Sequence, residues 1–422
     1  MRVTAQEAPA IDAAQVIADL RELARLTGDE RGSQRLCFGE TWREARAFLR
    51  SRLAEIGIEG DDVQVDAAGN LTARLPGADR GAPALAVGSH IDSVPDGGWL
   101  DGALGVMAAL GVLRAWSGAA SPPPRDIVLI DFADEEGARF GRSLFGSSAM
   151  AGHLDPAELA GVKDAAGVAI EEALAENDLT LEGAAAAGEA GLLDTLGAYL
   201  ELHIEQGPAL EAASISCSAV SGCAGVERHR LTFRGQASHA GTTPMDLRRD
   251  AGLAAAETAL AVERVARAHG GVGTTGTLDL EPGVITALAG RAELGVDLRH
   301  AKDEPLADMI SEALSAAATI ADERRCVFGG EPVWRIAPTR FDDELVARAA
   351  EVVAAAGGRG EPMVSGALHD AAEVASRVPV AMVFVASREG ISHAVEEDSS
   401  EADLTVGIEA FGALAAEVLA EG

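Results

Sequence analysis

The stretch VGSHIDSVPDGGWLDG, residues 87–102, indicates the fold because it joins a buried strand to a group of polar side chains. Just before it, residues 85–87 form a short apolar run that is typical of an interior strand. His90 and Asp92 follow two residues apart, which places them on one face of the extended chain. A carboxylate at this spacing can hold the second ring nitrogen of a metal-binding histidine, so Asp92 is a candidate for that supporting role.

The loop after His90 can return a second carboxylate toward the same point. Pro95, Gly97 and Gly98 allow a tight reversal of the chain, and Asp101 follows them as a candidate metal ligand. The alternative is that His90 is an ordinary surface histidine and that both aspartates only shape a turn. This stretch alone leaves both interpretations open.

Length and composition bound the class of protein. A chain of 422 residues with 48% hydrophobic residues is long enough for two domains, each with its own core. The formal net charge of −33 argues against nucleic acid or an anionic membrane as a partner. Metal cations and small cationic or neutral substrates remain compatible with that charge.

Cysteine usage and the N-terminal segment indicate the cytoplasm. The four cysteines form no CxxC pair, which supports neither a disulfide framework nor a thiolate zinc site. Residues 1–16 contain Glu7 and Asp12 and no sustained apolar core, unlike a signal peptide. No window approaches the roughly 18 uncharged apolar residues that a membrane span requires. We therefore expect a soluble cytoplasmic protein.

The spacing of apolar residues predicts an α/β fold. Residues 127–132 and 380–385 are largely apolar runs of the kind found in interior strands. Helical spacing appears at 11–27, 39–57 and 102–116. Strands that alternate with helices predict an α/β domain with a mostly parallel central sheet.

The pattern changes in the middle of the chain. Residues 226–234 alternate between apolar and polar, and two more short strands are expected around 274–280 and 291–299. Helices are expected at 250–268 and 304–321. Strand, helix, two strands and helix form a small α+β unit of their own.

The simplest organisation is a small domain inserted into a larger one. We place the larger, metal-binding catalytic domain at residues 1–211 and 331–422. The inserted α+β domain then occupies residues 212–330.

A second set of carboxylates lies in residues 131–140, DFADEEGARF, just past a predicted interior strand. Glu135 and Glu136 are neighbours and so point in different directions. One can bind a metal while the other faces a bound water as general base. The alternative is that this acidic pair only caps a helix.

Two further histidines lie at predicted strand ends or near the C-terminus. His203 stands in LHIEQGP and His393 in GISH. Singly, each could be a core histidine. Together with His90 and the two glutamates, however, they lie where open α/β sheets bind their ligands, at the C-terminal ends of the strands.

The complete set of motifs resembles a known family. It is similar to the dinuclear-metal amidohydrolases that include N-carbamoyl-L-amino-acid hydrolase, allantoate amidohydrolase and bacterial β-ureidopropionase, relatives of zinc aminoacylases and exopeptidases. The similarity covers most of the chain. The motifs that carry it occur in the family's order: GSHIDSVPDGGWLDGALGV, DEEGARF with GSSAMAG, ELHIEQGPALE, GQASHAGTTPMDLRRDA, VDLR, SGALHDAA and GISHAVEE.

The resemblance implies two divalent metal ions per subunit. The implied ligands are His90, Asp101, Glu136, His203 and His393, with Asp101 bridging both ions. Glu135 becomes the general base that activates a water between the metals. These donors suit Zn²⁺ or Mn²⁺, with Co²⁺ or Ni²⁺ also possible, and ligand identity does not choose among them.

The resemblance also implies substrate contacts. His239 would steady the tetrahedral oxyanion, often in a neighbouring subunit's site, and Arg299 would bind the substrate carboxylate. Gln206 and the backbone at Ser392 match further contacts. The alternatives are a turn histidine for His239 and an ordinary surface arginine for Arg299.

Three positions depart from the family pattern. Gly283 and Thr286 stand where asparagines are common, and Thr286 takes the place of a substrate-contacting asparagine. A threonine hydroxyl cannot offer the amide's donor and acceptor together. Leu368 replaces a frequent glycine. These changes put the exact substrate in doubt and leave the ligands and the base intact.

The function that this set favours is metal-dependent hydrolysis of a non-peptide C–N bond in a linear amide. The expected substrate is an N-carbamoyl-L-amino acid or a ureido acid such as allantoate. Alternatives are an N-acyl-amino-acid amidase or dipeptidase with the same site, and a catalytically silent binding protein. We expect a homodimer in which the inserted domain acts as a lid and dimerisation domain.

Overall fold

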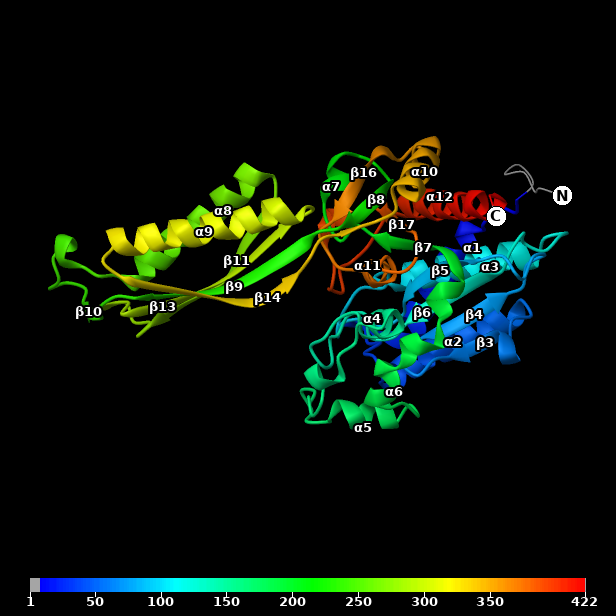
Figure 1. Cartoon of the computed structure of the whole chain (residues 1–422), viewed down its shortest axis with the longest axis horizontal. Coiled ribbons are helices and arrows are strands. Elements are labelled where there is room, and N and C mark those ends of the chain that lie inside the picture. Colours follow the sequence, from blue (N-terminus) through cyan, green and yellow to red (C-terminus); the bar gives the residue numbers. More distant parts are fainter. Residues whose placement is uncertain (1–7, 422) are drawn as a thin grey trace. The chain divides into compact units, whose positions relative to one another are not determined.

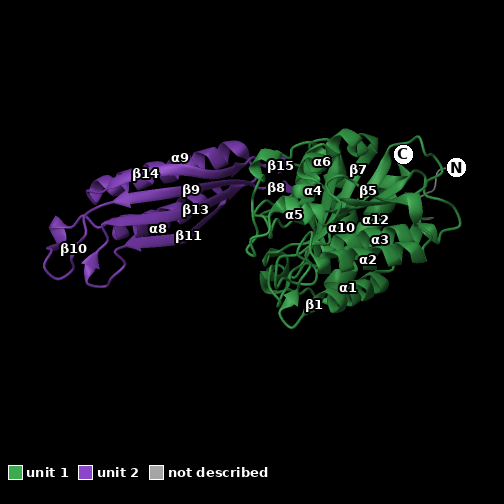
Figure 2. Ribbon diagram, turned by 90° about the horizontal axis from the view of Figure 1, so that it is seen from below, with its two compact units in different colours: residues 1–221, 340–422 green, residues 222–339 purple. Residues whose placement is uncertain are grey.

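The computed structural model describes residues 8–421, which divide into two compact units. Unit 1 comprises the described residues up to Ser221 and those from Arg340 onward, and unit 2 comprises residues 222–339. Figure 2 shows the two units in different colours. Their boundaries differ from 212 and 330 because β8 (Cys217–Cys223) pairs within the sheet of unit 1, whereas β14 (Val327–Ile336) pairs within that of unit 2.

Four parallel strands form the centre of the unit 1 sheet. Their side chains are nearly all buried, because helices cover both faces of such a sheet and apolar residues fill it. In spatial order they are β17 (Val380–Val385), β7 (Leu196–Ile204), β5 (Ala84–His90) and β6 (Ile127–Phe132). The expected α/β class with a mostly parallel central sheet is confirmed.

Antiparallel strands extend this sheet on both sides. β8 pairs with β17, and β4 (Leu71–Leu75) pairs with β6 and then with β3 (Val63–Val65). Helices α3 (Ala103–Ser117) and α12 (Glu401–Ala420) pack on the central strands, and α1 (Ala13–Thr27) packs on both of these helices. The remaining helices of unit 1 are α2 (Glu40–Glu55), α4 (Phe145–Ala151), α5 (Ile170–Ala175), α6 (Leu181–Ala185), α7 (Ala209–Ala212), α10 (Asp343–Ala355) and α11 (Asp370–Val374). Its other described elements are β1 (Gly28–Asp29), β2 (Gly32–Ser33), β15 (Thr339–Arg340), β16 (Arg359–Ser365) and five short 3₁₀ helices.

Unit 2 is an antiparallel sheet covered on one face by two helices, α8 (Ala251–His269) and α9 (Asp303–Glu323) (Figure 1). The strand order is β11 (Val272–Glu281), β13 (Arg291–His300), β9 (Gly225–Arg234) and β14. Alternate side chains of β9 and β13 form a core with the helices. A small ribbon of β10 (Ser238–His239) and β12 (Ala287–Leu288) completes the unit.

The sequence prediction missed the fourth strand of this sheet, β14, and returned the chain to the α/β pattern near Val333. Gly329, Gly330 and Pro332 disfavour a strand in the interior of a sheet. β14 is an edge strand, however, and its register shifts next to Pro332, so the missing N–H interrupts little pairing. In the described part of the chain, no helix is both long and apolar enough to cross a membrane.

Candidate active site

Two histidines lie at the C-terminal ends of neighbouring parallel strands. His90 is the last residue of β5 and His203 is the penultimate residue of β7. Both side chains are buried. The continuous apolar sequence that forms each strand therefore fixes both imidazoles at one edge of the sheet, as the sequence predicted.

Each of these rings is held by a backbone carbonyl. His90 Nδ1 lies 3.2 Å from the carbonyl oxygen of Asp92, and His203 Nδ1 lies 3.0 Å from that of Ile204. A carbonyl can only accept, so Nδ1 donates in both rings and Nε2 is turned toward the site. This tautomer is the one in which a histidine offers Nε2 to a metal.

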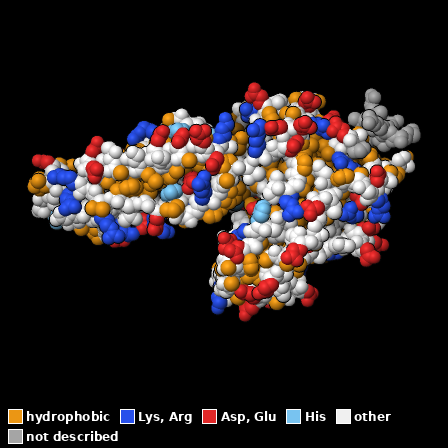
Figure 3. Space-filling model, in the orientation of Figure 1, with side chains coloured by type: hydrophobic (Ala, Val, Ile, Leu, Met, Phe, Trp, Pro, Cys, Tyr) orange, Lys and Arg blue, Asp and Glu red, His pale blue; other side chains and the backbone are white. Residues whose placement is uncertain are grey.

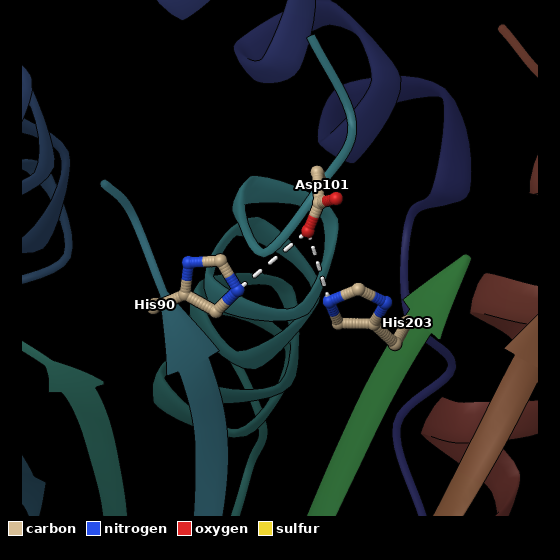
Figure 4. Close-up of side chains that lie close together, drawn as sticks. All are labelled: His90, Asp101 and His203. Carbon is tan, nitrogen blue, oxygen red and sulfur yellow. Dashed lines mark ion pairs between the residues drawn. The ribbon is translucent and has the colours of Figure 1, made fainter. Parts of the chain in front are cut away.

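Asp101 joins the two histidines. Its Oδ1 lies 3.6 Å from His90 Nε2 and 3.2 Å from His203 Nε2, as the dashed lines in Figure 4 show. Gly102 makes this approach possible, because its φ is 63° and a Cβ there would overlap the His90 ring. The glycine-rich return loop therefore brings the carboxylate to the strand ends.

The second oxygen of Asp101 faces a different histidine. Asp101 Oδ2 lies 3.3 Å from His393 Nε2, and the same nitrogen lies 3.5 Å from Glu136 Oε2. The His393 side chain is half exposed, so this side of the group is open to solvent. Asp101 thus has one oxygen in each of two clusters.

The donor set fits divalent metal ions. In the described part of the chain, three groups have ligand atoms close enough together to hold an ion: His90, Asp101 and His203; Asp101, Glu136 and His393; and Glu201, His203 and His369. His90 Nε2 is buried and has no hydrogen-bond partner among residues 8–421, which is costly unless an ion uses its lone pair. Imidazole and carboxylate without thiolate suit Zn²⁺ and Mn²⁺.

Glu135 is a buried carboxylate beside this group. Its Oε2 lies 3.6 Å from His90 Nε2. Burial raises the pKa of Glu135 well above its usual value, Asp370 and Glu136 add to the rise, and His90 opposes it. A carboxylate with a raised pKa next to the ligand atoms has the position and basicity of a general base.

Asp92 supports the site in a different way from the one that its spacing predicted. Its carboxylate Oδ1 is 3.6 Å from His90 Nδ1, farther than its own carbonyl oxygen. The carboxylate instead accepts the backbone N–H groups of Glu135 and Glu136, each at 3.3 Å. Asp92 therefore ties the loop after β6 to the loop after β5.

Burial and neighbouring charges together set the protonation states of these candidate ligands. Burial favours a neutral Asp101, but hydrogen bonds from His203 and His393 hold its pKa well below the usual range. A hydrogen bond with Asp101 raises the pKa of His393 to about 9, and burial raises that of Glu136 to about 7. Burial would lower the pKa of His90, but Glu135 and the aspartates raise it well above its usual value.

Two predicted substrate contacts lie against the open side of Asp101. Gln206 Nε2 donates to Asp101 Oδ2 at 2.7 Å, and Ser392 Oγ donates to the same oxygen at 3.1 Å. Gln206 adopts φ 56°, which is uncommon outside glycine and typical of functional sites. Both side chains are thus next to the ligand atoms.

Three other predicted residues belong to unit 2. Asp297 holds the Arg299 guanidinium through Nε at 2.8 Å and Nη2 at 3.3 Å. His239 is exposed in β10, and the Thr286 carbonyl accepts the N–H of Ala240. The structure brings nine of the predicted residues together in unit 1: His90, Asp92, Asp101, Glu135, Glu136, His203, Gln206, Ser392 and His393.

Some residues of the site escaped the sequence prediction. Glu397 binds the backbone of two ligand-bearing loops, and Glu201 accepts hydrogen bonds from Ser89, Tyr199 and Ala371 beneath the histidines. A weak signal existed for both, since each acidic residue stands within a recognised motif, GISHAVEE or ELHIEQGPALE.

Comparison with known proteins agrees with this geometry. The sequence pattern of peptidase family M20/M25/M40 matches residues 86–417. An N-carbamoyl-L-amino acid amidohydrolase of Geobacillus stearothermophilus is 40% identical over 384 residues, which cover 90% of this chain and 91% of the relative. Allantoate amidohydrolase of Bacillus subtilis is 31% identical over 384 residues, with the same coverage.

Solved structures are similar as well. The crystal structure of a hydantoinase/carbamoylase family amidase from Burkholderia multivorans has a TM-score of 0.89 and 31% sequence identity. The match covers 97% of this chain and 98% of that one. The resemblance that the motifs indicated is confirmed.

Proposed function

The chain belongs to peptidase family M20/M25/M40, and from that premise we propose that it hydrolyses a non-peptide C–N bond in a linear amide. The proposed substrate is an N-carbamoyl-L-amino acid or a ureido acid such as allantoate, because its relatives are named for these compounds. The observation that carries the proposal is the carboxylate of Asp101, whose two oxygens face two separate histidine groups.

Two divalent ions, Zn²⁺ or Mn²⁺, with Co²⁺ or Ni²⁺ possible, are the proposed cofactors. His90 and His203 would hold one side of the pair, Glu136 and His393 the other, and Asp101 both. When bound, such ions supply Lewis-acid activation of water and of the substrate carbonyl. Asp92 and the backbone carbonyls keep the ligands oriented.

Glu135 performs the proton transfer in the proposed mechanism. Its buried carboxylate accepts a proton from the attacking water and can return it to the departing nitrogen. The raised pKa makes this carboxylate a stronger base than an exposed glutamate, which favours its taking the proton. Gln206 and Ser392 lie beside Asp101, where they can orient the carbamoyl or ureido group.

Unit 2 supplies the remaining contacts in this proposal. Arg299 presents a planar fork suited to the substrate carboxylate, and Asp297 keeps that fork in place. His239 stabilises the oxyanion of the tetrahedral intermediate. Unit 2 would serve as the lid and dimerisation domain of a homodimer.

The cytoplasm is the proposed location. All four cysteines lie buried as thiols in the described part of the chain, as suits a reducing compartment. On the face seen in Figure 3, acidic and basic side chains are interspersed over both units. The net charge of −33 argues against nucleic acid or an anionic membrane as a partner.

A substrate panel tests the proposal. The protein is stripped with a chelator, reloaded with one metal at a time, and assayed for ammonia or amine release from N-carbamoyl, ureido, N-acyl and dipeptide substrates. Turnover of carbamoyl or ureido acids supports the proposal. Turnover of only acyl or dipeptide substrates would favour the amidase or dipeptidase alternative, and no turnover with any metal would favour a silent binding protein.

A further inference from the structure

Glu397 lies between two loops that carry candidate metal ligands. The loop after β5 contains Asp101, and the loop after β17 (Val380–Val385) contains His393. Glu397 is itself 1% exposed and contributes no atom to any of the three metal-ligand groups. Its buried carboxylate therefore has a use other than solvation or direct ligation.

Three backbone N–H groups from the two loops donate to Glu397. Oε1 accepts the N–H groups of Leu100 at 3.1 Å and Asp101 at 3.0 Å. Oε2 accepts the His393 N–H at 3.2 Å. The Ser392 hydroxyl also lies 3.1 Å from Oε2, but its one proton is donated to Asp101 Oδ2.

The backbone on either side of these contacts is in an uncommon conformation. His393 adopts φ 58°, a left-handed conformation that is strained for a non-glycine residue. Gly102, directly after Asp101, adopts φ 63°. The hydrogen bonds to Glu397 act on the N–H groups of the two ligand residues themselves and so help to hold this geometry.

Gly98 shows how closely the loop is packed on Glu397. A Cβ at Gly98 would overlap the Cβ and the carboxyl group of Glu397. Because three backbone N–H groups hold the buried carboxylate, it cannot move aside without losing some of these hydrogen bonds. Gly98 therefore leaves room for this one side chain.

We infer that Glu397 is a positioning residue that sets the separation of Asp101 and His393, so that the site is formed before an ion binds. This inference rests on the proposed function only in assuming that Asp101 and His393 bind a divalent ion. Without Glu397, the two ligand loops would have to be ordered by the ion itself. That ordering would reduce metal affinity.

Glu397→Gln tests the inference by changing one acceptor into a donor. Whichever way the amide is turned, its NH₂ group would then face at least one backbone N–H that it cannot accept. Supporting groups of this kind typically contribute 10–100-fold to metal affinity, so we expect the dissociation constant for Mn²⁺ or Zn²⁺ to rise by about that factor. Isothermal titration of the metal-free protein measures this without any substrate.

Gly98→Ala tests the same contact from the opposite side. It keeps every charge and every hydrogen-bonding group but displaces the Glu397 carboxylate, so we expect the same loss of metal affinity. The matched controls are Gly118→Ala, where a Cβ meets only ordinary contacts, and Asp126→Asn, which changes a buried carboxylate at the other end of β6 (Ile127–Phe132). Neither control should change the dissociation constant.

Activity gives a second readout. Both variants should regain turnover as the metal concentration is raised, because the ligands themselves are intact. Wild-type metal affinity in folded Glu397→Gln and Gly98→Ala would overturn the inference, as would a failure of either variant to fold. If the wild-type protein binds no divalent ion, the proposed function fails first, and the two failures are thereby distinguished.

Discussion

His239 and Arg299 lie at opposite ends of unit 2. Arg299 pairs with Val226 at one end of β13, and Arg291 pairs with Arg234 at the other. At about 3.3 Å per residue, this part of the strand is roughly 26 Å long. His239 lies in β10, beyond the end that holds Arg291. One small amino-acid derivative therefore cannot contact both side chains of a single chain.

This separation predicts complementation between two inactive variants. We expect His239→Ala and Arg299→Ala to be nearly inactive alone, because each removes one contact from every site. In a mixed dimer, one of the two sites receives an intact His239 from one chain and an intact Arg299 from the other. A subunit-exchanged equal mixture should therefore regain about one quarter of wild-type activity.

Activity is measured after exchange in mild denaturant and refolding, with each variant treated alone as the control. A mixture no more active than its components would contradict a site shared between chains. A wild-type protein that light scattering shows to be monomeric would also contradict a shared site.

Arg299→Ala should impair both steady-state constants. In the proposed function the guanidinium binds the substrate carboxylate. A hydrogen bond to a charged group contributes about 1.5–3 kcal/mol, so kcat/KM should fall by about 10- to 100-fold. Because this contact also favours the closed arrangement of the site, kcat should fall as well as KM rise. Arg299→Lys keeps the charge without the fork and should be intermediate. A change in KM alone would contradict the lid role of unit 2.

Glu135→Gln should separate catalysis from metal binding. The amide cannot accept the proton of the attacking water, so kcat should fall by about 10²- to 10⁴-fold. Metal content, measured by atomic absorption after dialysis, should equal that of the wild type, because Glu135 is not a ligand. Glu136→Gln is the matched comparison and should lose metal instead. Near-normal turnover in Glu135→Gln would exclude it as the base.

The sequence predicted the parts of the site that depend on strand ends. His90 and His203 follow apolar runs that form parallel strands, and such strands bring their C-terminal ends together by topology alone. The residues that hold the ligand-bearing loops in place were less predictable. Asp92 and Glu397 act on backbone N–H groups, which every residue except proline has, so no residue type marks the partner.

The arrangement of unit 2 was not predictable from motifs either. His239 and Arg299 both belong to recognised motifs, but their separation depends on the register of β9 with β13. Register follows from which side chains share a face and from turn geometry, and it is not specified by the motif residues. Only the structure shows that one chain cannot present both residues to one substrate.

Metal binding should release protons, because the ligands of the metal-free protein are partly protonated. A hydrogen bond with Asp101 raises the pKa of His393 to about 9, and burial raises that of Glu136 to about 7. Both groups bind a metal only when they have lost the proton, so lowering the pH favours the proton over the ion. Affinity should accordingly rise with pH from about 6 to about 10, where both are mostly deprotonated.

Near pH 7, His393 is mostly protonated and Glu136 about half so, and these two groups together should contribute between one and two released protons, roughly. The pKa of His90 is also raised, so a proton on that ring adds to this number. Titration calorimetry in buffers of different ionisation enthalpy counts these protons directly. The variant His393→Gln should release about one proton fewer, since its amide carries no titrating proton. Metal affinity that is independent of pH across this range would show that His393 and Glu136 are not ligands.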